Sequence, residues 1–105
     1  MAKVKFSLDP NPTFKGEVKI PVAGDKPGVI EFIFTYRDRD ELAAFTEKTQ
    51  GREDWVNVMD MASGWDLDDP WGEQSVKKLL VKYHGAAMAI YEAYYSELFK
   101  GRQGN

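Results

Sequence analysis

Side chains that could do chemistry are few in this sequence and lie far apart. There is one histidine, His84, and no cysteine, so disulfides, thiolate metal sites and a cysteine nucleophile are excluded together. His84 stands outside any HExxH or H-x-H spacing and directly precedes Gly85, which favours a position at a helix break. Ser63, Ser75 and Ser96 lie outside any G-x-S-x-G motif. We therefore predict no catalytic residues and no enzymatic activity.

Acidic residues around Asp68 and Asp69 raise the question of a calcium site or of acid–base chemistry. An EF-hand loop counted from Asp66 would need glycine at Trp71 and an acidic ligand at Lys77, so the pattern fails. Acid–base catalysis would also need a pocket and a tuned pKa, which the sequence does not show. The segment is more typical of a turn between helices in which one of the two aspartates caps the next helix. We predict no metal ion and no cofactor.

Composition and charge narrow the classes of partner. The chain has 105 residues, 43% hydrophobic and 30% charged, with a formal net charge of −3, which is typical of one globular domain. Lys77, Lys78 and Lys82 form one short basic patch that we interpret as a solvated helix face, so nucleic acid is not an expected partner. Neither a membrane-spanning run nor a secretory h-region is present. We expect a cytoplasmic protein with no membrane partner.

The first third of the sequence has the pattern of β-strands. Residues 13–20 and 29–36 alternate apolar and polar side chains, and the turn-forming segment 23–28 separates them. The short segment Lys3–Leu8 also alternates and is a candidate third strand. The sequence predicts an antiparallel β-hairpin or a three-stranded sheet, which needs a cover on its apolar face.

About four helices are predicted to provide that cover. Asp38 and Glu41 have the spacing of a capping box, with Leu42 and Phe45 facing inward. Gly51 is predicted to end this first helix. The remaining predictions are a helix from Asp54 through Ala62 that Gly64 caps, a helix with the stripe Val76, Leu79, Leu80 and Tyr83, and a last helix from Ala86. Strands followed by helices predict an α+β fold. We expect one domain over 1–105, with 1–37 mainly β, 38–100 mainly α and 101–105 a frayed tail.

Aromatic residues are the most unusual feature, because they make up 13% of the chain. Trp65 and Trp71 bracket the acidic turn, and Tyr91, Tyr94 and Tyr95 nearly encircle the last helix. Exposed tryptophan and tyrosine are favoured anchors in protein interfaces. The alternative is that the two tryptophans fold back onto the helices as a satellite core. We predict a partner-binding surface formed by Trp65, Asp66, Leu67, Trp71, Tyr91 and Tyr95.

Taken in order, several segments resemble a known family. These are residues 9–15, 18–22, 32–37, 39–42, 64–71 and 83–87, followed by the pattern Ile90, Ala93, Tyr94, Leu98, Arg102 and Asn105. Together they resemble a phage tail assembly chaperone family of long-tailed phages and prophages, and the similarity covers nearly the whole chain. The segment Gly64-Trp65-Asp66, in its order with the others, is the most specific part.

The resemblance implies a role in building a siphophage-like tail. Chaperones of this kind coat the long tape measure protein, keep it soluble and help tail tube subunits polymerise around it. They are absent from the mature virion, and a ribosomal frameshift in related systems gives a longer form of the protein. The implied partners are the tape measure protein, the tail tube protein and the longer form. Self-association into a homo-oligomer is also expected, since coating a long substrate benefits from contacts between neighbouring copies. The alternative is a structural tail or tail-completion protein that is retained in the virion.

Overall fold

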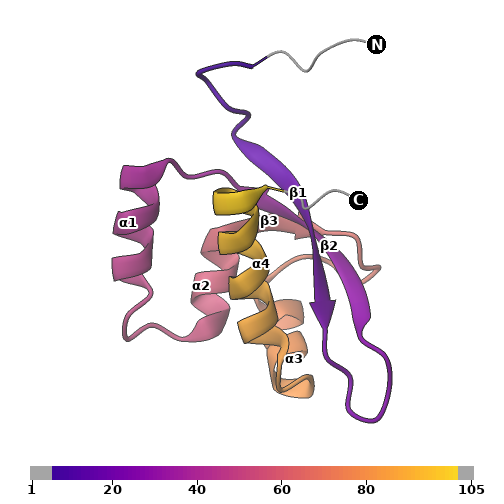
Figure 1. Cartoon of the computed structure of the whole chain (residues 1–105). Helices are drawn as coiled ribbons and strands as arrows, with labels where there is room; N and C mark the ends of the chain where they lie inside the picture. The colour runs from indigo at the N-terminus through magenta and orange to yellow at the C-terminus, as the bar shows by residue number, and fades with distance from the viewer. Residues whose placement is uncertain (1–5, 102–105) are drawn as a thin grey trace, which may run out of the picture.

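A three-stranded antiparallel sheet and four helices form the part of the chain described by the computed structural model, residues 6–101 (Figure 1). In chain order the elements are β1 (Thr13–Ile20), β2 (Gly28–Thr35), α1 (Arg39–Lys48), α2 (Asp54–Met61), β3 (Ala62–Trp65), α3 (Glu73–Lys82) and α4 (Ala86–Lys100). The sheet order is β1-β2-β3. The predicted α+β fold, with its strands near the N-terminus, is confirmed.

One face of the sheet is buried because apolar residues alternate with polar ones along β1 and β2. Val18 lies opposite Ile30, and Gly16 lies opposite Phe32, with all four buried. Gly16 is needed at its position, since a Cβ atom there would come within 2.8 Å of the Phe34 ring. The other face carries exposed charged residues of β1, as the alternation predicts.

The third strand is not the one that the sequence predicted. The candidate Lys3–Leu8 lies partly outside the described residues, and its described part, 6–8, forms no strand. The strand beside β2 is instead β3, so the prediction that Ala62 is helical and that Gly64 caps a helix was wrong. Helix α2 ends at Met61, and Ala62 turns directly into extended backbone with φ −141° and ψ 159°. Four residues that include a glycine are too few to show a strand period in the sequence.

A β-bulge in β3 decides which way its side chains point. Phe34 pairs with Ala62 and Ile33 pairs with Gly64, so Ser63 is the extra residue. Ala62 and Trp65 are three positions apart and would face opposite sides of a regular strand. The bulge brings both onto the buried face, where Ala62 is 4% exposed and Trp65 contacts Phe32.

The helix boundaries follow the predicted signals in most places. The Asp38 carboxylate accepts a hydrogen bond from the Glu41 backbone N–H (2.8 Å), and the Asp38 N–H donates to the Glu41 carboxylate (2.9 Å), which confirms the capping box. The predicted cap of α3 is wrong: Gly72 precedes the helix, and neither Asp68 nor Asp69 caps it. The predicted break at His84 and Gly85, between α3 and α4, is confirmed.

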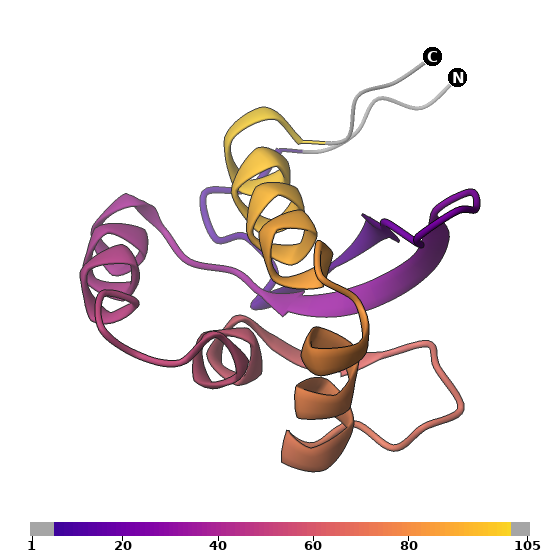
Figure 2. The same cartoon turned by 90° about the horizontal axis from the view of Figure 1, so that it is seen from below.

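The core lies between the sheet and the helices. Helix α4 packs against β1, and α2 packs against β2, β3, α3 and α4 (Figures 1 and 2). Tyr94 is fully buried at the centre, and its ring lies 5.3 Å from that of Phe34 and 5.9 Å from that of Phe45. The predicted inward-facing Leu42 and Phe45 of α1 are buried, but Tyr83, the last residue of the predicted stripe on α3, is exposed.

Candidate protein-binding site

The two tryptophans form a half-buried pair at the edge of the core. Their rings meet edge to face with centroids 5.0 Å apart, and each also packs edge to face on Phe32. The Trp65 indole N–H donates to the backbone carbonyl of Asp69 (2.8 Å), which holds the connecting loop in a tight curve. The indoles are therefore satellite core as well as surface.

Asp66 ties the start of this loop to the sheet. Its backbone N–H donates to the Glu31 carbonyl (3.0 Å), and its carboxylate accepts from the Glu31 N–H (2.9 Å). The pairing of β2 with β3 is thus prolonged by one residue, and the next side chain, Leu67, is left 37% exposed. The sequence motif Trp-Asp-Leu therefore builds a fixed loop that presents one leucine.

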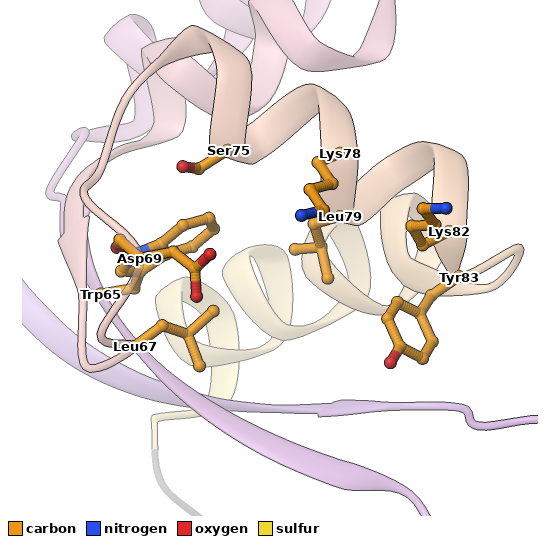
Figure 3. Close-up of a pocket in the computed structure, with 8 residues that line it drawn as sticks. All are labelled: Trp65, Leu67, Asp69, Ser75, Lys78, Leu79, Lys82 and Tyr83. Carbon is orange, nitrogen blue, oxygen red and sulfur yellow. The ribbon is translucent and has the colours of Figure 1, made fainter.

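An open groove of about 430 Å³ lies between this loop and α3 (Figure 3). Its apolar lining comes from Trp65 and Leu67 on the loop side and from Leu79 on the helix. Tyr83 lies at the far end, beyond the last turn of α3. Tyr83 was predicted to face inward with the helical stripe, but it is exposed; Leu79 of the same stripe is buried, as predicted, and contributes to the floor of the groove.

The helix side of the groove is basic. Lys78 and Lys82 are exposed and line the groove one turn apart on the helix. Lys77 is different, because its ammonium pairs with Glu73 (2.7 Å) and lies 4.5 Å from the centre of the Trp55 ring. Within residues 6–101, no ion pair is formed by Lys78 or Lys82.

Tyr91, predicted as a partner anchor, takes part in a polar network with α2. Its hydroxyl donates to the Asp54 carboxylate (2.9 Å) and accepts from the side-chain amide of Asn57 (2.9 Å). Burial raises the pKa of Tyr91, and the hydrogen bond from Asn57 opposes that rise. Asn57 is 1% exposed, and its side-chain oxygen accepts from the Arg52 guanidinium (2.8 Å). This network was not predicted, because in the sequence Asn57 is only one polar position of a helix.

Tyr95 joins α4 to α1. Its hydroxyl lies 2.7 Å from the Thr46 hydroxyl, and its ring packs edge to face on Tyr94. The Tyr94 hydroxyl donates to the Thr35 carbonyl (2.8 Å) and accepts from Arg37 (2.9 Å). Burial raises the pKa of Tyr94 and the Arg37 cation opposes the rise. Of the predicted surface, the structure brings Trp65 and Leu67 to the groove with α3, whereas Tyr91 and Tyr95 do not line that groove in the described part of the chain.

Residues that could hold a metal ion are not grouped in this fold. Within residues 6–101, no three histidine or acidic side chains lie close enough together to share an ion. The same part of the chain has no helix that is both long and apolar enough to cross a membrane.

The described residues form a small α+β domain with an open, partly apolar surface groove. The family model described as phage tail assembly chaperone matches residues 1–105, and the chain belongs to that family. Its role is that of a chaperone in tail assembly, which implies protein partners, and the resemblance seen in the sequence is confirmed. Neither a curated protein nor a solved structure gives a match to this chain.

Proposed function

We propose that this chaperone binds the tape measure protein, keeps it soluble before assembly and assists the polymerisation of the tail tube around it. Membership of the family supports a chaperone role, and the observation that carries the proposal is the open groove between the Trp65–Trp71 loop and α3. The groove exposes Leu67 and Tyr83 beside the half-buried indoles.

The physical reason lies in the nature of a long helical client. Apolar stripes of an unassembled tape measure protein would associate with one another, and a reversible cover prevents this. A groove with an apolar floor accepts side chains from one stripe, as in other complexes of helices with grooved domains. Many copies along one client would multiply a modest affinity at each groove.

The tail tube protein, a frameshifted longer form and further copies of this chain are the other proposed partners. The protein works in the cytoplasm of the host cell and is absent from the mature virion. The competing function is that of a tail or tail-completion protein that stays in the particle.

Co-expression with the longest protein encoded in the same tail gene cluster tests the proposal. We expect that protein to become soluble and to co-purify with this chain. The variant Leu67→Lys, which places a charge in the groove, should reduce co-purification. Its matched control is Val29→Lys, because Val29 is exposed on the outer face of β2, away from the groove.

Failure of the long protein to become soluble or to co-purify with the wild-type chain would contradict the proposal. Detection of this chain in purified virions by mass spectrometry would then favour the structural tail protein. Equal loss of co-purification in both lysine variants would show that the groove is not the binding surface.

A further inference from the structure

Opposite charges face each other across the groove. Lys78 and Lys82 stand on the α3 wall, and Asp69 stands on the loop wall. Figure 3 shows the Lys78 amine beside Leu79 and the Asp69 carboxylate directed into the space beside Leu67. The apolar floor therefore has one basic rim and one acidic rim.

The basic rim has no ion-pair partner among the described residues 6–101. Lys78 and Lys82 are one helical turn apart, and like charges at that spacing repel each other. Lys77, the neighbouring residue, has both a carboxylate and an aromatic ring beside it. Since no carboxylate within residues 6–101 pairs with Lys78 or Lys82, their charges remain available to a bound molecule.

We infer that the groove binds an amphipathic segment that carries carboxylates on one flank of its apolar stripe, the flank that faces Lys78 and Lys82. Apolar side chains of the segment lie over Leu67, Trp65 and Leu79. Asp69 repels carboxylates on the other flank, so the charges fix the orientation of the segment as well as its composition. This inference rests on the proposed function, because it names the chemistry of the client segment at the same groove.

Two designed helical peptides test the inference with the full-length chain. Both carry the same leucine stripe with an uncharged second flank, and the first flank holds glutamates in one peptide and lysines in the other. Fluorescence anisotropy of the labelled peptides gives the dissociation constants. We expect the glutamate peptide to bind about fivefold to tenfold more tightly than the lysine peptide, an advantage that shrinks in 1 M salt.

Reversing the charges of Lys78 and Lys82 tests whether these two lysines cause the preference between the peptides. The double variant Lys78→Glu/Lys82→Glu should prefer the lysine peptide. The matched control Lys19→Glu/Lys26→Glu changes the net charge equally at two exposed positions in β1 and the β1–β2 turn, and should keep the wild-type preference. Circular dichroism checks that both double variants remain folded.

Equal affinity for the two peptides, or an unchanged preference in Lys78→Glu/Lys82→Glu, overturns the inference. Tighter binding of single-stranded DNA than of the glutamate peptide, lost in the same variant, also overturns it in favour of a phosphate ligand. A result can reject this inference without contradicting the proposed function. If the long tail-cluster protein co-purifies equally with wild type and with Lys78→Glu/Lys82→Glu, the proposed chaperone role is retained and the inferred preference for carboxylates is rejected.

Discussion

Two regions of this molecule are rich in aromatic residues. In one region these residues join the elements of the fold, and in the other they border an open groove. On the α4 side, the hydroxyls of Tyr91, Tyr94 and Tyr95 all bond to groups of other elements. On the loop side, the indoles pack together, but the neighbouring Leu67 and Tyr83 stay exposed over a groove. The first region fastens α1, α2 and the sheet to α4, and the second offers a surface. Aromatic content alone therefore does not identify an interface; the two regions differ in that the loop side leaves the large side chains Leu67 and Tyr83 exposed beside the groove that it forms with α3.

The largest expected effect is on stability, in the tyrosine region. Tyr94→Ala removes a fully buried ring that contacts Phe14, Phe34 and Phe45. We expect the free energy of unfolding to fall by about 3–5 kcal/mol, the usual cost of truncating a buried aromatic residue. Urea denaturation followed by circular dichroism measures the change. A loss below 1 kcal/mol would mean that this region is not the structural centre.

The buried amide in the same region should have the next largest effect. Asn57→Ala leaves the Arg52 guanidinium and the Tyr91 hydroxyl each without one hydrogen-bond partner. Because both hydrogen bonds are part-buried and one involves a charged group, we expect a loss of about 1–3 kcal/mol. The control Asp60→Asn tests the adjacent, more exposed part of the network, where Asp60 pairs with Arg37 and Arg52, and should cost less. The reverse order of costs would contradict the role given to Asn57.

Alkaline pH should weaken the tyrosine region selectively. Burial raises the pKa of Tyr94 above its value in the unfolded chain, so the folded state retains a proton that the unfolded state releases. The stabilisation is complete below about pH 10, and it is lost as the pH rises through the folded-state pKa. Urea midpoints between pH 8 and pH 11 should therefore fall more steeply for the wild type than for Tyr94→Phe. Parallel curves for the two proteins would refute this assignment.

The smallest effect on stability is expected in the groove. Leu67→Ser alters an exposed side chain and should change the free energy of unfolding by less than about 1 kcal/mol, while it reduces co-purification of the client. Trp65→Ala is a poorer probe, since it also removes the packing on Phe32 and the bond to Asp69. A Leu67→Ser chain that loses stability but keeps its client would reverse the contrast between the two regions.

Long periodic segments made much of the fold predictable. Alternation in β1 and β2 and the capping box of α1 are local signals, and each appears in the structure where the sequence places it. Strand β3 was missed because it is short, contains Gly64 and carries a bulge at Ser63. Its extended form depends on pairing with β2, a contact between distant parts of the chain that local patterns do not encode.

The candidate site was predictable only in part, for a related reason. Residue type suggested Trp65 and Leu67, and the structure places both at one groove. The same reasoning also selected Tyr91 and Tyr95, whose partners Asp54 and Thr46 are more than thirty positions away in the chain. Lys78 was assigned to a solvated helix face. The sequence could not show that Lys78 borders a groove, because the opposite wall is a loop whose position depends on β3 and its bulge.

Site-specific photo-crosslinking tests the central claim, that the groove holds the client, most directly. A photoreactive amino acid replaces Leu67 in the groove or, in a matched control, the exposed Ser96 on α4. Each variant is co-expressed with the long tail-cluster protein, irradiated and analysed for covalent adducts. We predict adducts to that protein from position 67 and none from position 96. Adducts from position 96 alone, or equal yields from both positions, would contradict the assignment of the groove as the client site.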